Sequence, residues 1–132
     1  MMEDSVLYIG IDLVEKDRIE RVLTHFEDRF LERLFTFEEI DYYRKGTRRR
    51  FCEGVAAIFA AKEAVKKILL QTGIKPLWKS IEIRHDSDGH PWVSVPLEVR
   101  KVLSDIQLSL SHTGNLVVAM AVGVLVKGRK QA

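Results

Sequence analysis

A long amphipathic segment at residues 51–71 constrains the fold of this chain more than any other part of the sequence. Successive helical residues turn by about 100°, and on that spacing one broad apolar face holds Phe51, Ala57, Ile58, Ala61, Val65, Ile68 and Leu69. The opposite side is also apolar and holds Cys52, Ala56, Phe59, Ala60 and Leu70. A helix with two apolar sides lies between other elements, so we expect it in the core or at a subunit contact.

Around this helix the sequence predicts an α+β domain in which the long central helix packs on a small, mostly antiparallel sheet. Before the helix we expect a strand at 6–14 with both faces buried and a helix that Asp17 caps and that ends at residue 25 or 26. A short helical piece at 30–34 and a helix that begins at a Thr36–Glu39 capping box are expected next. After it we expect a hairpin of strands 80–85 and 92–95, a short helix at 97–104, and strands at 106–111 and 116–126.

Composition predicts one compact, cytoplasmic domain over residues 1–132. The net charge of +2 is too small to indicate a nucleic-acid-binding protein. Cys52 is the single cysteine, so no internal disulfide can form, and a reducing compartment is expected. The first residues lack the basic and apolar regions of a signal peptide, and no apolar run is long enough to span a bilayer, so we expect no membrane partner.

Two acidic residues stand among apolar neighbours. Glu63 falls within the second apolar stripe of the long helix, with Lys67 one turn further on, and Asp12 lies on one face of the first strand. An ion pair between Glu63 and Lys67, and a cap or arginine partner for Asp12, are the ordinary interpretations. The alternative is a hard cation held by carboxylate oxygens, since magnesium needs only one or two of them when a substrate supplies phosphate oxygens. Gly10, on the same face as Asp12, would leave room for a ligand.

The remaining candidates are weaker. His25, His85 and His90 have no ligand spacing and fit surface or turn positions. Ser111 and His112 lie at a strand end, where sites are common. The arginines at 48–50 suit either a phosphate or a solvated helix flank, and a nucleic-acid module built on residues 45–50 is disfavoured by the low net charge. The sequence holds no nucleophile-elbow, metalloprotease or P-loop motif.

Several segments, taken together, resemble the holo-[acyl-carrier-protein] synthase family of short bacterial 4′-phosphopantetheinyl transferases. Residues 10–19 are similar to its G-x-D-x-x-x-x-x-R-I stretch, residues 59–67 to its F-A-A-K-E-A-x-x-K helix, and residues 109–113 to its S-x-S-H-T strand end. Residues 30–36 resemble its F-x-x-R-x-x-T segment, and residues 81–91 fit its I-E-I…G-x-P hairpin. The resemblance covers nearly the whole chain, in order and at family spacing.

The resemblance implies transfer of the 4′-phosphopantetheine moiety of coenzyme A to a serine of an apo-acyl-carrier protein, with adenosine 3′,5′-bisphosphate as the second product. The implied cofactor is Mg²⁺, with Asp12 and Glu63 as its ligands, and the implied catalytic residues are Glu63 and Lys67. For coenzyme A the implied residues are Lys67, Gln71, Thr72, Gly73, Ser111 and His112. Arg18 and Arg21 are expected to dock the acidic carrier protein.

The family is trimeric, so the resemblance also implies a homotrimer with sites shared between subunits, to which Ser111 and His112 come from a neighbour. The sequence departs from the family pattern at Ile58, where an arginine is usual, and at Gln71, where a glycine is usual. Both positions lie near the nucleotide in the family. A non-catalytic relative that binds carrier protein or nucleotide is the alternative function, and Ile58 favours it.

Overall fold

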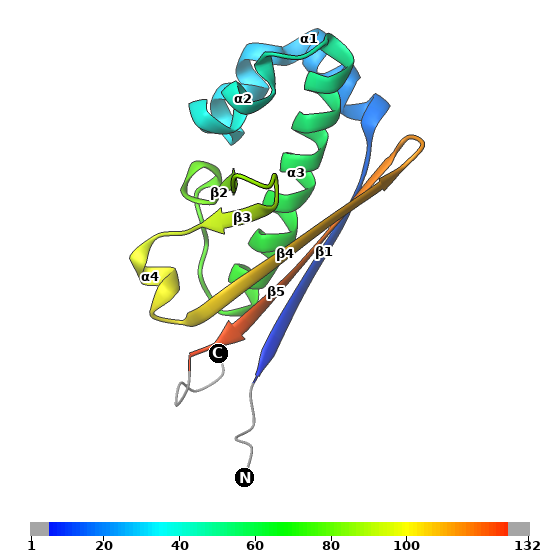
Figure 1. Cartoon of the computed structure of the whole chain (residues 1–132). Coiled ribbons are helices and arrows are strands. Elements are labelled where there is room, and N and C mark those ends of the chain that lie inside the picture. Colours follow the sequence, from blue (N-terminus) through cyan, green and yellow to red (C-terminus); the bar gives the residue numbers. More distant parts are fainter. Residues whose placement is uncertain (1–5, 127–132) are drawn as a thin grey trace.

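The computed structural model describes residues 6–126 (Figure 1). The elements follow the order β1 (Leu7–Glu15), α1 (Lys16–Leu34), α2 (Phe37–Arg44), α3 (Arg48–Gln71), η1 (Trp78–Ser80), β2 (Glu82–His85), β3 (Pro91–Ser94), α4 (Leu97–Arg100), β4 (Leu103–Thr113) and β5 (Leu116–Leu125). This is the predicted α+β fold: the long helix α3 crosses a small antiparallel sheet, and the other helices gather around its ends.

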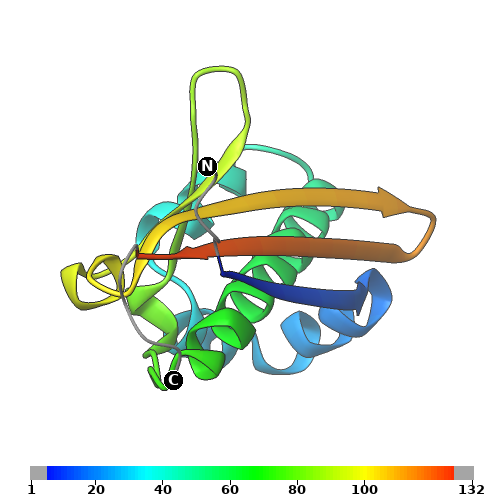
Figure 2. The same ribbon diagram turned by 90° about the horizontal axis from the view of Figure 1, so that it is seen from below.

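The main sheet has three strands in the order β1-β5-β4, and both neighbouring pairs are antiparallel. Its register places Asp12 opposite Ala119, and Ala119 opposite Leu110. Strands β2 and β3 form a separate two-stranded hairpin. Seen from below, this hairpin projects beyond the edge of the sheet that β4 forms, while β1 makes the opposite edge (Figure 2).

Helix α3 is the centre of the core. Ala61, Val65 and Ile68 are fully buried on the face that meets the sheet. Strand β1 comes unusually close to the helix at Gly10, where a Cβ atom would stand 1.9 Å from the carbonyl oxygen of Ala64. Only a residue without a side chain allows the two backbones to approach this far. Glycine at position 10 therefore sets the distance between β1 and α3, rather than leaving space for a ligand.

The prediction that β1 is buried on both faces is wrong for the single chain. Gly10 and Val14 face α3 and are buried, whereas the alternating residues Leu7, Ile9, Ile11 and Leu13 are 55% to 64% exposed. The helices cover one face of the three-stranded sheet, and nothing within residues 6–126 covers the other. We call these four side chains, with Leu116 and Met120 of β5, the open apolar face.

The local capping predictions have mixed outcomes. The Thr36–Glu39 capping box is confirmed, with both of its hydrogen bonds present. Asp17 is not the cap of α1, because the helix begins at Lys16 and the preceding Glu15 makes no side-chain cap bond. The two helical pieces predicted before residue 35 are joined in α1 across a kink at Phe26, whose φ and ψ of −140° and 33° are not helical.

Other boundaries shift by a few residues. Helix α3 begins at Arg48, capped by the Thr47 hydroxyl, so the arginines at 48–50 lie in its first turn and not before the helix. The helix predicted at 97–104 ends at Arg100, because the buried side chains of Val102 and Leu103 already lead into β4. The hairpin and its turn are confirmed, with Gly89 at the positive φ that such turns favour.

Candidate functional site

An acidic site lies where β1 meets α3. We define it by Asp12, Glu63 and Lys67. The ammonium group of Lys67 donates to the carbonyl oxygen of Ile11 at 2.6 Å and lies 3.4 Å from Oδ1 of Asp12. Glu63 is half-buried one turn earlier on the same face of α3. The close approach of Gly10 to Ala64 brings the strand and the helix together at this level.

The ordinary interpretations of these residues are not met in the structure. Lys67 pairs with Asp12, and no ion pair joins Glu63 to Lys67 among the described residues. The Glu63 carboxylate takes part in no side-chain hydrogen bond or ion pair within residues 6–126. A half-buried carboxylate without a described partner, one helical turn from the lysine that pairs with Asp12, is a donor that suits a hard cation. The residues present therefore fit a magnesium ion.

The other predicted residues on α3 lie at its C-terminal end, beside the outer edge of β1. The Gln71 amide donates to the carbonyl oxygens of Ile9, at 3.0 Å, and of Lys67, at 3.1 Å. The Thr72 hydroxyl donates to the carbonyl oxygen of Leu69, and Gly73 has a φ of +85°. Lys67 and Gln71 thus hold two exposed carbonyl groups of the edge strand.

Ser111 and His112 lie elsewhere, in a groove of about 990 Å³ on the β4 side of the sheet. Helix α2, the start of α3, the β2–β3 hairpin and β4 form its walls, and its lining includes Tyr42, Tyr43, Arg50, His85, Ser111 and His112. The sheet order β1-β5-β4 places β5 between the strand of Ser111 and His112 and the strand of Asp12. One chain therefore divides the predicted site residues between two places.

The groove combines flat aromatic surfaces with cations. The rings of Tyr42 and His85 stack at 4.0 Å and 6°, and the Tyr43 hydroxyl lies 3.3 Å from Nε2 of His85. Burial raises the pKa of Tyr43 to about 12 and lowers the pKa of His85, so both are neutral near pH 7. Lys45 and Arg50 also line the groove. Such a surface suits a nucleotide, whose base stacks and whose phosphates pair with cations.

Sequence reasoning missed the aromatic part of the groove. His85 was placed at the surface, and Tyr42 and Tyr43 received no role. Tyr42 and His85 come from α2 and β2, and no periodicity in the sequence indicates that these elements meet. The resemblance of residues 81–91 to a family hairpin is the one signal that pointed to this region.

The three arginines at 48–50 and Ile58 lie in different environments. Arg48 pairs with Glu27, and Arg49 pairs with Glu53, so these two are engaged on the surface. Arg50 lines the groove. Ile58 is 1% exposed and belongs to the core, whereas the preceding Ala57 lines the groove. In the single chain, position 58 therefore presents no side chain to a nucleotide.

Arg18 and Arg21 are both exposed in the first turns of α1. The guanidinium of Arg21 lies 4.0 Å from the carboxylate of Asp17, a surface pair that contributes little to stability. Both cations are therefore free to meet an acidic partner.

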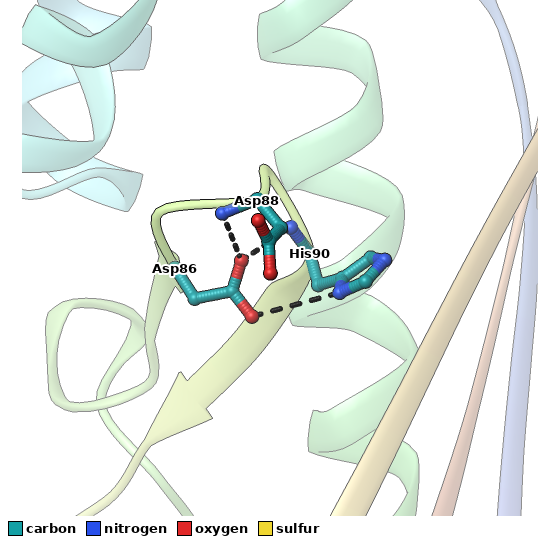
Figure 3. A group of neighbouring side chains, drawn as sticks. All are labelled: Asp86, Asp88 and His90. Carbon is teal, nitrogen blue, oxygen red and sulfur yellow. Dashed lines mark hydrogen bonds and ion pairs between the residues drawn. The ribbon is translucent and has the colours of Figure 1, made fainter.

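An acidic cluster of Asp86, Asp88 and His90 lies at the tip of the β2–β3 hairpin (Figure 3). Oδ1 of Asp86 accepts the backbone N–H groups of Asp88 and His90, both at 2.9 Å, and these bonds lower the pKa of Asp86. All three residues are exposed. The cluster is therefore explained as the hydrogen bonding of a tight turn.

Known proteins resemble this chain over most of its length. Residues 8–121 match the profile of the 4′-phosphopantetheinyl transferase superfamily. A holo-[acyl-carrier-protein] synthase of Alkaliphilus metalliredigens is 42% identical over 121 residues, which are 86% of this chain and 95% of that protein. One of Thermoanaerobacter sp. is 37% identical over 124 residues, which are 89% of this chain and 87% of that protein.

Solved structures give the same result. The holo-(acyl-carrier-protein) synthase of Bacillus anthracis in complex with CoA (3′,5′-ADP) superposes with a TM-score of 0.76 at 32% identity, over 92% of this chain and 99% of that one. The enzyme of Neisseria meningitidis superposes with a TM-score of 0.73 at 32% identity, over 87% and 95% of the two chains. In the part of this chain that the structure describes, no helix has the length and apolar character needed to cross a membrane.

Proposed function

Because this chain belongs to the 4′-phosphopantetheinyl transferase superfamily, we propose that it transfers the 4′-phosphopantetheine arm of coenzyme A to a serine of an apo-acyl-carrier protein. The products are the holo-carrier protein and adenosine 3′,5′-bisphosphate. The observation that carries the proposal is the acidic site, in which the Glu63 carboxylate, without a described partner, lies one helical turn from Lys67 of the Asp12–Lys67 pair. Solved structures of relatives in complex with coenzyme A support coenzyme A as the substrate.

Asp12 and Glu63 are the residues that would hold Mg²⁺. A magnesium ion bound by these carboxylates would supply positive charge against the negative charge that develops on a leaving phosphate. Glu63 accepts the proton of the attacking carrier serine, directly or through a water molecule, because it is the carboxylate left without a partner. Lys67 already lies 3.4 Å from Asp12, and its ammonium adds positive charge where phosphate would approach.

The groove is our proposed place for the nucleotide half of coenzyme A. Its stacked Tyr42 and His85 rings offer a platform for adenine, and its cations offer partners for phosphate. Ser111 and His112 line the same groove. A nucleotide groove fits both the enzyme and a non-catalytic relative that binds nucleotide, and Ile58, the feature that favours the latter, lies in the core instead of the groove.

A homotrimer would bring the two places together. Within one chain β5 separates the acidic site from the groove, and the open apolar face of β1 and β5 stands uncovered. A neighbouring subunit packed on that face would bury apolar area and bring its own groove toward the acidic site. Closed rings of heterologous contacts combine different residues at every interface. We therefore assign Asp12 and Glu63 to one subunit and Ser111 and His112 to the next.

Subunit mixing tests this assignment. Glu63→Ala and His112→Ala proteins, each first shown to be nearly inactive, are unfolded together and refolded at equal ratio. Random assembly leaves about a quarter of the sites with both residues intact, so activity near that fraction supports shared sites. If mass measurement shows mixed trimers and activity stays at the level of the better single variant, the site belongs to one chain.

Arg18 and Arg21 are proposed to dock the acidic carrier protein, because both are exposed on α1. Reversing either to glutamate is expected to slow association with the carrier protein, since charges at an interface rim act mainly on the on-rate. Coenzyme A affinity, measured by calorimetry, is expected to stay the same. An equal loss of coenzyme A affinity would move these arginines into the nucleotide site.

Intact-mass spectrometry tests the reaction itself. Apo-acyl-carrier protein incubated with this protein, coenzyme A and magnesium is expected to gain the mass of one phosphopantetheine arm. Asp12→Asn and Glu63→Gln are expected to remove the gain without unfolding the protein, whereas Glu38→Gln, which changes an exposed acid of α2, serves as the matched control. Coenzyme A binding with no mass gain would favour the non-catalytic function.

A further inference from the structure

The groove carries positive charge from residues that lie far apart in the sequence. Lys16 lines it together with Lys45 and Arg50, and none of these three cations takes part in an ion pair within residues 6–126. Glu53 also lines the groove, but its carboxylate pairs with Arg49. The groove therefore offers cations that no described carboxylate neutralises.

The backbone at Lys16 is fixed by the β4–β5 turn. The Lys16 N–H donates to the carbonyl oxygen of Asn115 at 2.7 Å. The Asn115 side chain accepts from the Asp17 N–H at 3.0 Å and donates to the Asp17 carboxylate at 2.9 Å. We call these three hydrogen bonds the Asn115 clasp. The clasp joins the first residue of α1 to the turn that follows Ser111 and His112.

The Lys16 side chain extends toward His112. Its Nζ atom lies 3.5 Å from Nδ1 of His112, and Lys16 is half-buried although it is a lysine in the first turn of a helix. An ammonium group carries three protons, so two remain to be donated after one has approached the imidazole. Because no ion pair engages Lys16 within residues 6–126, its ammonium group keeps protons available for an anion at this end of the groove.

Several other polar side chains that the sequence offers for a phosphate are engaged elsewhere. Arg48 pairs with Glu27, Arg49 pairs with Glu53, and the Gln71 amide is bonded to the edge of β1. Position 58, where the family has an arginine, holds a core isoleucine. Lys16 has the charge, the position and the fixed backbone that a phosphate contact in this groove needs.

We propose that Lys16 binds a phosphate group of coenzyme A at the end of the groove that Ser111 and His112 form. This inference rests on the proposed function. A charge-assisted hydrogen bond to phosphate is worth enough for its loss to weaken binding by about tenfold or more. A lysine acts as a point charge on phosphate, so arginine can replace it where a single contact is made.

Calorimetric titration with coenzyme A, in the absence of carrier protein, tests the role of Lys16. Lys16→Met is expected to raise the Kd about tenfold or more, Lys16→Arg to keep most of the affinity, and Lys101→Met, which changes an exposed lysine outside the groove, to leave it unchanged. Dephospho-coenzyme A separates the two sources of phosphate. If Lys16→Met no longer raises the Kd when dephospho-coenzyme A is the ligand, Lys16 contacts the 3′-phosphate. If it raises the Kd as much as it does with coenzyme A, Lys16 contacts the pyrophosphate.

Two outcomes would overturn the inference in distinguishable ways. If the wild-type protein binds coenzyme A and Lys16→Met binds it within twofold of the same Kd, Lys16 makes no phosphate contact and the proposed function stands. If the wild-type protein binds no coenzyme A at all, the proposed function fails, and this inference fails with it. Thermal unfolding of each variant shows that the proteins compared are folded at the titration temperature.

Discussion

Replacing Lys62 by methionine is expected to lower the free energy of unfolding by about 3–5 kcal/mol. Lys62 stands beside Glu63 on α3, but its side chain points into the protein and pairs with Glu39 of α2 at 2.7 Å. Both side chains are 0% exposed. Methionine fills most of the volume of the lysine stem, so the change removes the charge and leaves only a small cavity.

The magnitude follows from what Glu39 would lose. Its Oε1 atom accepts from Lys62 and from the Thr36 N–H at 2.8 Å, and its Oε2 atom accepts from the Ile83 N–H at 2.8 Å. Glu39 thus joins α2, α3 and β2. Burial lowers the pKa of Lys62, and the Glu39 carboxylate opposes that effect. Without the ammonium, a carboxylate remains buried with two amide donors and no opposite charge.

Urea unfolding followed by circular dichroism measures the effect. For a chain of 132 residues we expect the thermal midpoint to fall by roughly 10–20 °C. Glu39→Gln is expected to lower the free energy of unfolding as much or more, because one amide oxygen cannot accept hydrogen bonds from all three donors that the Glu39 carboxylate serves. Lys75→Met changes an exposed lysine and is expected to stay within about 0.5 kcal/mol of wild type.

The reasoning is refuted if Lys62→Met unfolds within about 0.5 kcal/mol of wild type, as the exposed control does. That result would mean that Glu39 takes up a proton or reaches water at little cost. Measuring the coupling free energy between Lys62→Met and Glu39→Gln in a double-mutant cycle separates the pair from the other bonds of Glu39.

Three further changes test particular contacts. Gly10→Ala is expected to destabilise the protein by at least about 1–3 kcal/mol in urea unfolding, because the new Cβ would stand 1.9 Å from the Ala64 carbonyl oxygen; wild-type stability would contradict the close approach. Ile58→Arg is expected to lower stability without tightening coenzyme A, because position 58 is 1% exposed in the core; tighter binding in calorimetry would show that it reaches the groove. The hydrogen bond from Asn115 in the clasp lowers the pKa of Asp17 from its ordinary value of 3.8. The ionised Asp17 side chain therefore stabilises the fold above pH 3.8, and this stabilisation is lost as the pH falls through the lowered pKa. NMR titration is expected to show this pKa rising in Asn115→Ala; an unchanged value would exclude the clasp as its cause.

Local rules allowed the sequence to predict much of the fold. The helix at 51–71 followed from periodicity, and the Thr36–Glu39 box and the hairpin turn followed from short motifs whose bonds close within a few residues. Each of these depends on neighbours in the sequence. The helix predicted at 97–104 was too long because Val102 and Leu103 are buried by contacts with the sheet side of the domain, and local preference does not report such contacts.

The candidate site was less predictable from pattern alone. Periodicity placed Asp12 and Glu63 among apolar residues, and on that pattern alone ordinary ion-pair or capping roles were favoured over a metal site. The resemblance to a family chose between them, and the structure then placed Lys67 against Asp12 instead of Glu63. The position of Lys16 in the groove could not be predicted from its sequence neighbours, because it depends on hydrogen bonds to Asn115, which lies 98 residues beyond Asp17 along the chain.

The error at β1 and the division of the site support the same explanation. Alternation predicted a strand buried on both faces, yet Ile9, Ile11 and Leu13 are more than half exposed. Exposed apolar side chains on a flat strand face normally mark a contact surface. The sheet order independently keeps Ser111 and His112 one strand away from the strand of Asp12. A neighbouring subunit that covers the open apolar face would account for both observations, since a strand whose second face is buried only in an assembly would show the same apolar alternation in its sequence.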